Sequence, residues 1–427
     1  MTTEFRIPDE IAAKAIDPKA YADDSVHEAF RWLRANQPLG KVEIEGIYPF
    51  WMVTRHADIL EISRQNDLFH NGDMPATFTT IEADQAVRKM TGGSPHLVRT
   101  LVQMDAPDHP KYRVMTQSWF LPQNIKKLDE RIREIARQHV DRMAALGTEC
   151  DFVNEIALYY PLRVIMEILG VPAEDEPRML RLTQELFGAQ DPELNRDRQE
   201  VMQTPEAMAS LQAVIADFFM YFKGITDDRK ANPVGDLASV IANGQLDGAP
   251  INDFEAMSYY VIVATAGHDT TSSSTAAAVW GLAANPDEFA KVKADPSLIP
   301  GLVDEAIRWM TPVKHFMRSA TEDTEVGGRQ IAKGDWIWLA YPSGNRDEAV
   351  FEDPDAFRVD RASGKHLAFG YGAHLCLGQH LAKMEMRILF EELLPRLQSL
   401  ELAGEPKLAQ ANFVGGPKTL PIRYHLT

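Results

Sequence analysis

The stretch between residues 256 and 284 constrains the fold more than any other part of the chain. It is the most apolar stretch of the sequence, yet His268, Asp269 and eight serines and threonines interrupt it. A membrane-spanning helix needs about 20 consecutive apolar residues, which this stretch does not provide. A helix that is apolar on all sides is buried inside its domain. The sequence therefore predicts a long, buried core helix over residues 253–284.

Helical patterns dominate the rest of the chain, and strand-like runs are few. No Gly/Ser linker, low-complexity run or internal repeat divides the sequence, which favours a single domain over residues 1–427. We expect a mainly α protein with a small β region, in which two strands near the C-terminus pair with each other. The other expected helices are 27–35, 57–65, 111–117, 122–146, 156–169, 174–186, 205–228, 287–294, 299–309 and 377–394, and the expected strands are 42–47, 51–54, 325–331, 335–341, 399–403 and 421–425.

Composition excludes several classes of function. The net charge of −18 argues against nucleic-acid binding, which needs clusters of Lys and Arg. The N-terminus has neither the basic nor the apolar region of a signal peptide, and no segment predicts a membrane anchor. Only Cys150 and Cys376 are present, so there is no disulfide framework, as expected for a cytoplasmic protein.

Cys376 lies in the glycine-punctuated segment from Phe369 to Gly378, directly before a helical pattern. A thiol ahead of a helix faces unpaired N–H groups and the positive end of the helix dipole, which favour the thiolate. Such a thiolate is suited to act as a nucleophile, a redox thiol or a metal ligand. A zinc site with His374 and His380 lacks the usual paired ligand spacing, whereas a catalytic thiol with a distant histidine remains open. Small residues around the sulfur would also let a flat macrocycle approach the backbone closely.

The segment Phe369-Gly-Tyr-Gly-Ala-His-Leu-Cys376-Leu-Gly378 resembles the haem-binding loop of the cytochrome P450 superfamily of haem-thiolate monooxygenases. The resemblance covers nearly the whole chain and points to soluble bacterial members, especially the terpineol-hydroxylating branch. It implies the cytochrome P450 fold, with haem b (iron protoporphyrin IX) between the long central helix and the helix after the cysteine loop. Four further landmarks occur in the family's order: His109-Pro-Lys-Tyr-Arg113, Ala266-Gly-His-Asp-Thr-Thr271, Glu305-Ala-Ile-Arg308 and Pro354-Asp-Ala-Phe-Arg-Val-Asp-Arg361.

The resemblance also implies a role for each landmark. Cys376 is the axial ligand of the haem iron, and its thiolate pushes electron density toward bound oxygen. Thr270 donates a hydrogen bond to that oxygen, and Asp269 passes protons inward. His268 is expected to be a packing or surface residue. Cationic groups are expected to meet the haem propionates (His109, Arg113, Arg318 and His374), and a buried ionic network is expected beside the cysteine loop (Glu305, Arg308 and Arg361).

The implied substrate is a small hydrophobic molecule: a monoterpenoid, an alkylbenzene or an aromatic hydrocarbon. Residues 78–102 are expected to form a lid over it. The pocket walls carried over from the family are mostly apolar, and comprise Phe78, Ile262, Thr265, Ala266, Gly267, Val313, Phe316, Phe413 and Val414.

The reaction needs O2 and two electrons, and the chain has no flavin or iron–sulfur signature. The implied partners are therefore a ferredoxin and its NAD(P)H-dependent reductase. The candidate docking cations near Cys376 are Lys111, Arg113, Lys126, Lys127, Lys383 and Arg387.

Three alternatives stay open from the sequence. A peroxide-driven or isomerising member of the superfamily would commonly lack the acid–alcohol pair that Asp269 and Thr270 form here. A haem-binding sensor or carrier would bind haem without turnover. A non-haem enzyme would use the Cys376 thiol with a histidine.

Overall fold

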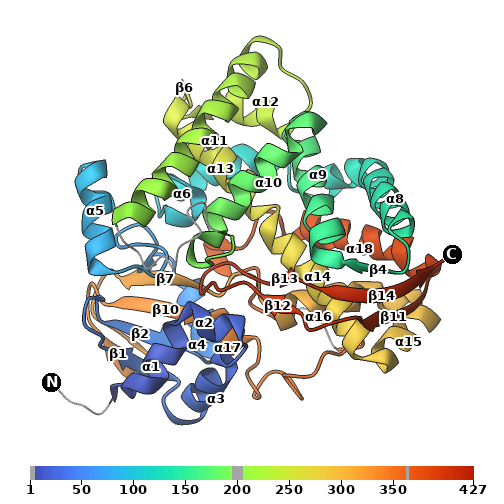
Figure 1. Ribbon diagram of the computed structural model, residues 1–427. Coiled ribbons are helices and arrows are strands. Elements are labelled where there is room, and N and C mark those ends of the chain that lie inside the picture. Colours follow the sequence, from blue (N-terminus) through green and yellow to red (C-terminus); the bar gives the residue numbers. More distant parts are fainter. Residues whose placement is uncertain (1–4, 195–204, 362–364) are drawn as a thin grey trace.

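The computed structural model describes residues 5–194, 205–361 and 365–427. Figure 1 shows helices filling the upper part of the molecule and its right-hand side, while the largest sheet lies at the lower left. The prediction of a mainly α protein with a small β region is confirmed. Within the described residues, no helix combines the length and apolarity needed to cross a membrane.

The predicted central helix is present but is broken into α13 (Asp253–Ala266) and α14 (Asp269–Ala284). Gly267 and His268 form the break, and the Thr270 hydroxyl donates to the Ala266 carbonyl oxygen at 2.8 Å. Such back-bonding and a helical glycine both weaken the regular ladder, which explains why one apolar segment becomes two helices. α14 is deeply buried and packs against α9 (Tyr159–Ile168), α16 (Ile299–Met310) and α18 (Gln379–Arg396).

Most of the other predicted helices occur within a few residues of their expected bounds. The segment expected as one helix over 122–146 is interrupted by a tight turn at Lys126–Leu128, and the one over 156–169 starts with a wide turn at Val153–Ala157. The sequence patterns did not indicate five further helices, most of them short: α1 (Asp9–Ile16), α2 (Pro18–Ala22), α5 (Ile81–Thr91), α12 (Leu237–Ala242) and α17 (Tyr341–Gly344). The remaining helices are α3 (Val26–Asn36), α4 (His56–Arg64), α6 (Asp108–Gln117), α7 (Pro122–Ile125), α8 (Asp129–Ala145), α10 (Glu176–Phe187), α11 (Pro205–Ala231) and α15 (Pro286–Ala294).

The largest sheet has the strand order β1-β2-β10-β7-β3. The strand expected over 42–47 is wrong, because β1 ends at Val42 and the chain turns at Gly46, which has a φ of +81°. The run over 325–331 is a hairpin rather than one strand, since Gly327 and Gly328 both have positive φ. The strands are β1 (Leu39–Val42), β2 (Phe50–Val53), β3 (Phe69–His70), β7 (His315–Ala320) and β10 (Trp336–Ala340), with the hairpin formed by β8 (Thr324–Val326) and β9 (Arg329–Ile331).

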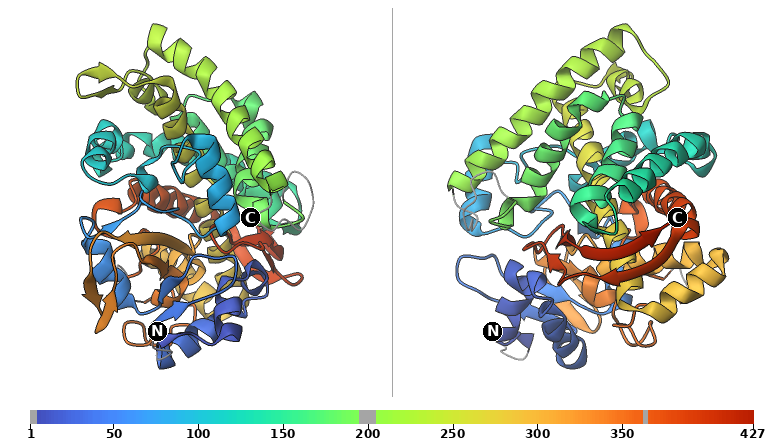
Figure 2. Two further views of the ribbon diagram at one scale, coloured as in Figure 1. Left: turned by 90° about the vertical axis from the view of Figure 1, so that its left-hand side faces the viewer. Right: turned by 45° about the vertical axis from the view of Figure 1, so that its right-hand side comes forward.

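The predicted pairing of the two C-terminal strands is confirmed. β11 (Leu397–Leu402) runs antiparallel to β14 (Pro421–Leu426), with Leu400 opposite Tyr424, and β4 (Glu149–Asp151) pairs with the other edge of β14. In the right-hand view of Figure 2 this sheet crosses the front of the molecule. Two smaller pairs complete the β structure: β5 (Gln245–Leu246) with β6 (Ala249–Pro250), and β12 (Lys407–Leu408) with β13 (Pro417–Thr419).

Candidate active site

The cysteine loop is held in one conformation by its glycines and its backbone. Gly370 and Gly372 have φ values of +68° and +72°, a region that favours glycine. A Cβ on Gly372 would lie 2.1 Å from the Ser63 carbonyl oxygen, so no other residue fits there. The Cys376 N–H donates to the Phe369 carbonyl oxygen at 2.9 Å and closes the loop just before α18.

The thiol of Cys376 is exposed to solvent, yet the protein surrounds it closely enough to raise its pKa. Burial is the largest cause, and the backbone N–H groups of Gly378 and Gln379 and the charge of Arg113 oppose it. The expectation from the helix terminus was that these N–H groups would favour the thiolate. These N–H groups do lower the pKa of the thiol, but in the protein without haem the effect of burial, which raises this pKa, is larger. A bound metal cation deprotonates a coordinating thiol, so this sulfur is suited to be a metal ligand.

The four cationic residues carried over for the propionates gather beside the cysteine loop. The rings of His109 and His374 lie 4.3 Å apart between centroids, and the charges of Arg318 and Arg113 both act on His374. Burial, with Arg318, His109 and Arg113, lowers the pKa of His374 to about 2. In the protein without haem, the His374 ring is therefore neutral at physiological pH. Arg318 lies within strand β7 rather than in a loop.

This cluster leaves donors unpaired. Arg113 donates to the Leu375 carbonyl oxygen at 2.7 Å, and Arg318 donates to the Met317 carbonyl oxygen at 2.8 Å. In the described part of the chain, neither arginine forms an ion pair with a carboxylate, and the buried Nε2 of His109 has no hydrogen-bond partner. A group with two carboxylates and a metal that accepts a thiolate satisfies all of these residues, so the site fits haem.

The break in the central helix presents an acid and an alcohol. Thr270 is half-buried at the start of α14, next to the exposed Ala266. The Oδ2 of Asp269 is buried and has no hydrogen-bond partner, and it lies 3.4 Å from the Nδ1 of His268. His268 itself is fully buried: its ring bonds the Thr183 hydroxyl at 2.9 Å and the Leu158 carbonyl oxygen at 2.8 Å. His268 is thus a packing residue that fixes the turn carrying Asp269.

Glu385 is a buried acid that the sequence patterns did not single out. It lies on α18 at 2% exposure, and its Oε2 has no hydrogen-bond partner among the described residues. Burial raises its pKa well above 4.5, and a hydrogen bond with Thr271 of α14 opposes the rise. The sequence did carry a signal for this burial: Glu385 lies one helical turn from both Leu381 and Leu389, in the buried stripe of α18. A neutral carboxylic acid thus links the cysteine helix to the helix that carries Thr270.

Glu305, Arg308 and Arg361 meet in one ionic network. Both oxygens of Glu305 accept from Arg308, at 2.7 and 2.8 Å, and both accept from the Nε of Arg361 at 3.1 Å. Glu305 also accepts from the Arg358 N–H at 2.9 Å. Arg308 donates onward to the carbonyl oxygens of Asn345 and Pro354, at 2.8 Å each. The Glu305 and Arg308 side chains are 1% and 2% exposed, so the network is a buried, fully bonded unit that ties α16 to the segment before the cysteine loop.

The residues expected to line the substrate pocket differ in their contacts and in their exposure to solvent. Phe316 lies 5.5 Å from Phe413 between ring centroids, and Val313 bridges to Val414, so the start of β7 and the C-terminal loop do come together. Ile262, Ala266 and Gly267 are partly or fully exposed along α13.

Two of the expected wall residues are placed differently. Thr265 is 1% exposed, and its hydroxyl donates to the Val261 carbonyl oxygen at 2.7 Å, so its side chain is packed against its own helix. Phe78 packs 5.2 Å from Trp338 between centroids, within the aromatic cluster of the large sheet. The segment expected as a lid over residues 78–102 contains α5 rather than a continuous loop.

The candidate docking cations are largely engaged within the chain. Lys111 pairs with Asp247 at 2.5 Å, Lys383 with Asp304 at 2.7 Å, and Arg387 with Asp129 at 3.3 Å. Arg113 turns toward the propionate cluster instead of the surface. Lys126 and Lys127 are exposed.

Comparisons with known proteins agree with this geometry. The family model "Cytochrome P450" matches residues 82–420. The chain is 50% identical to "Cytochrome P450-terp" from a Pseudomonas species, over 99% of each chain. It is 32% identical to linalool 8-monooxygenase from Pseudomonas putida, over 95% of this chain and 97% of that protein. The crystal structure of CYP108D1 from Novosphingobium aromaticivorans superposes with a TM-score of 0.91 at 47% identity, covering 99% of this chain and 100% of that one.

The matched region contains all five landmarks, from His109 to Gly378. The family implies a haem cofactor, which the cysteine loop and the cationic cluster fit. We conclude that the chain belongs to the cytochrome P450 family and is a monooxygenase.

Proposed function

We propose that this monooxygenase hydroxylates a monoterpenoid of about the size of linalool, using haem b, O2 and electrons from a ferredoxin. The observation that carries most weight is the 50% identity with "Cytochrome P450-terp" over 99% of the chain. The linalool 8-monooxygenase of Pseudomonas putida adds a second relative whose named substrate is a terpenoid. A structural relative at 29% identity, from Mycobacterium marinum, was solved with pseudoionone.

The apolar residues at the junction of β7 and the C-terminal loop support this substrate class. Phe316, Phe413 and the Val313–Val414 bridge present aromatic and aliphatic surface with no charged group of their own. An apolar surface of this kind binds a hydrocarbon skeleton by burial and does not pair with a charged substrate. Alkylbenzenes and aromatic hydrocarbons have similar chemistry, so they are the comparison compounds in the test below.

In the proposed mechanism, haem bound through Cys376 supplies the activation of O2. The backbone N–H groups of Gly378 and Gln379 point toward the sulfur and moderate its electron donation. Arg113 and Arg318 would hold the haem propionates by charge-assisted hydrogen bonds. The buried network of Glu305, Arg308 and Arg361 keeps the cysteine loop in place.

The acid and alcohol at the helix break handle protons. The Oδ2 of Asp269 is buried and makes no hydrogen bond within the described residues, so this carboxylate would be placed to pass protons inward. The Thr270 hydroxyl donates to the Ala266 carbonyl oxygen, and it would be able to exchange this bond for a hydrogen bond to O2 or to water beside it. We further propose that the whole chain, residues 1–427, acts as one domain.

The test is a spectral titration of the ferric holoenzyme with linalool, α-terpineol, p-cymene and naphthalene. A substrate that displaces the water on the iron shifts the spectrum from low to high spin. We expect saturable shifts with the two terpene alcohols and weaker ones with the hydrocarbons. A shift with naphthalene alone would overturn the substrate class. Turnover with a ferredoxin and its reductase should yield one hydroxylated product per NAD(P)H, and NAD(P)H-independent turnover with peroxide alone would overturn the partner.

A further inference from the structure

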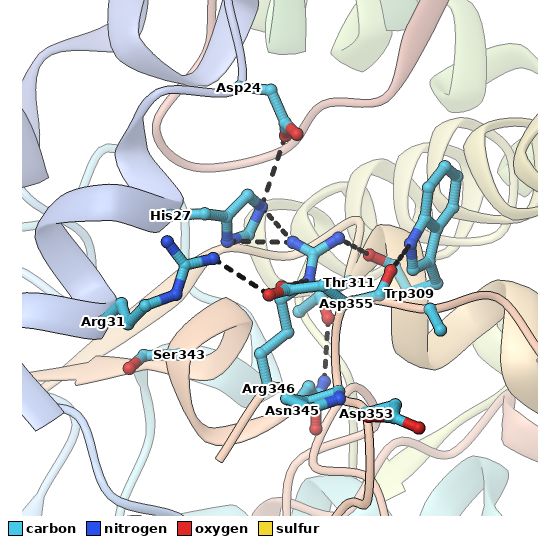
Figure 3. A network of polar contacts seen from close by, with 12 residues as sticks. Asp24, His27, Arg31, Trp309, Thr311, Ser343, Asn345, Arg346, Asp353 and Asp355 are labelled. Atoms are coloured by element: carbon cyan, nitrogen blue, oxygen red, sulfur yellow. Dashed lines mark hydrogen bonds and ion pairs between the residues drawn. The ribbon is translucent and has the colours of Figure 1, made fainter. Parts of the chain in front are cut away.

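A small cavity lies among α2, α3, α16, α17 and the C-terminal loop, and none of the residues assigned to the haem or the substrate lines it. Its volume is about 70 Å³, which is room for a few water molecules or one small ion. Two of its lining residues are the buried cations Lys314 and Arg346, which are 9% and 6% exposed. Figure 3 shows the polar network around Arg346 at this cavity.

Lys314 is a buried ammonium with too few partners. Its Nζ donates to the Met310 carbonyl oxygen at 2.9 Å, whereas an ammonium has three N–H donors. No carboxylate in the described part of the chain lies within ion-pair distance of it. Burial and the nearby charge of Arg346 lower its pKa to about 7, while Asp24 opposes the shift.

Arg346 is also incompletely bonded. Its guanidinium donates to the Trp309 carbonyl oxygen at 3.2 Å and contacts the ring of His27. Its Nε forms an ion pair with the Asp355 carboxylate at 3.4 Å, and it makes no hydrogen bond within the described residues. The unsatisfied donors at the cavity are therefore those of the Lys314 ammonium, and Arg346 adds a second positive charge there.

The charges around the cavity do not balance when Lys314 is protonated. Burial, followed by the charge of Arg346, lowers the pKa of His27 to about 4, so this ring is neutral at physiological pH. Asp24 is 63% exposed and contacts His27 at 3.3 Å, and Asp355 is shared with Arg31 at 2.9 Å. Arg346 shares Asp355 with Arg31, whereas in the described residues no carboxylate lies within ion-pair distance of the Lys314 ammonium. A buried, unpaired charge is strongly unfavourable.

We propose that this cavity binds one small monovalent anion, with the Lys314 ammonium as its ligand and the Arg346 guanidinium as a second positive charge beside it. The anion supplies the missing charge and accepts the unsatisfied hydrogen bonds. The site is separate from the haem and the substrate, and it stands whether or not the proposed substrate class is right.

The site also has a structural connection to the substrate wall. The Lys314 N–H donates to the Phe413 carbonyl oxygen at 2.7 Å, and the Gly415 N–H donates to the Pro312 carbonyl oxygen at 3.0 Å. These bonds hold Val313 against Val414. Gly415 and Gly416 line the cavity themselves, so an anion bound there would stabilise the C-terminal loop from behind.

The test uses the ferric holoenzyme and sodium chloride as the probe. The thermal midpoint is measured at pH 6.5 against chloride concentration, with ionic strength held constant by sodium gluconate, whose anion is too large for the cavity. We expect a saturable rise in the wild type and in Lys333→Met, which removes an exposed lysine elsewhere. Lys314→Met should shift the chloride dependence to at least tenfold higher concentrations. Equal chloride dependence in wild type and Lys314→Met, or none in the wild type, would overturn the proposal.

The same titration at pH 9 gives a second readout. Loss of the Lys314 proton removes the charge that the anion balances, so the chloride dependence should weaken at least tenfold; an unchanged dependence would overturn the assignment of Lys314. The titratable and charged groups facing Lys314 are Tyr21, Asp24, His27 and Arg346.

If Lys314→Met does not fold, wild-type crystals soaked in sodium bromide decide the question. An anomalous peak in the cavity, in contact with the Nζ of Lys314, supports the site. A cavity that holds water alone at the same bromide concentration contradicts it.

Discussion

Replacing Glu305 by glutamine tests whether the buried network is what holds the cysteine loop. The substitution keeps the size of the side chain and removes its charge. Glu305 accepts from Arg308, Arg361 and the Arg358 N–H, at distances from 2.7 to 3.1 Å. Because Arg308 is 2% exposed, its guanidinium would be left buried without a counter-charge.

The magnitude follows from that burial. Removing one partner of a buried ion pair costs about 3–5 kcal/mol. At roughly 2.1 cal/mol/K per residue, a chain of 427 residues has an unfolding entropy of about 0.9 kcal/mol/K. The expected fall in the thermal midpoint is therefore roughly 3–6 °C.

The assay is thermal unfolding of the holoenzyme, followed by far-ultraviolet circular dichroism and by the Soret band. Glu322→Gln is the matched control, because Glu322 is exposed and an exposed substitution of this kind changes stability by about 0.5 kcal/mol or less. In Glu305→Gln we expect the Soret band to be lost before the helical signal, since the network lies beside the haem loop. A midpoint equal to that of the control, with haem retained, would refute the reasoning.

Three other predictions concern single side chains. Thr270→Ala should keep the haem and still consume NAD(P)H, but release hydrogen peroxide, with the yield of product per NAD(P)H lowered about tenfold or more. Thr270→Ser should restore this yield. An unchanged product yield in the alanine variant would contradict the assigned role. Arg318→Met should weaken haem retention about tenfold or more in a transfer assay to apomyoglobin, because a charge-assisted hydrogen bond is lost; loss equal to that of the exposed-site variant Arg181→Met would count against it. Burial raises the pKa of Glu385 well above 4.5, so between pH 4.5 and that raised pKa unfolding releases a proton and wild-type stability falls as pH rises. The Glu385→Gln variant cannot release this proton, so its stability relative to wild type should increase between pH 5 and pH 8. A pH-independent difference in stability would show that Glu385 is ionised in the folded protein.

Much of the architecture was predictable because it depends on local patterns. Apolar periodicity located most of the long helices, and alternation located β10 and the pairing of β11 with β14. The failures occurred where local geometry overrides the pattern. A single helix was expected over 253–284, but Gly267 and the back-bonding hydroxyl of Thr270 break it.

The site was predictable where a motif carried it and not where burial alone created it. The cysteine loop and the cationic cluster follow from residues that recur in a known order along the chain. Thr265 is expected at the pocket wall, and the sequence pattern did not indicate that its side chain is 1% exposed. Glu385 and Lys314 have no motif, and each looks like an ordinary surface charge until the fold buries it. Burial of a single polar side chain depends on packing between distant elements, which periodicity does not report.

The central claim is that Cys376 is the thiolate ligand of a haem iron. The most direct measurement is the absorption spectrum of the reduced, CO-bound protein, compared with those of Cys376→Ser and Cys150→Ser. The account predicts a strongly red-shifted Soret band in the wild type and in Cys150→Ser, and its loss in Cys376→Ser. A wild type without the red-shifted band, or a Cys376→Ser variant that retains it, would contradict the account.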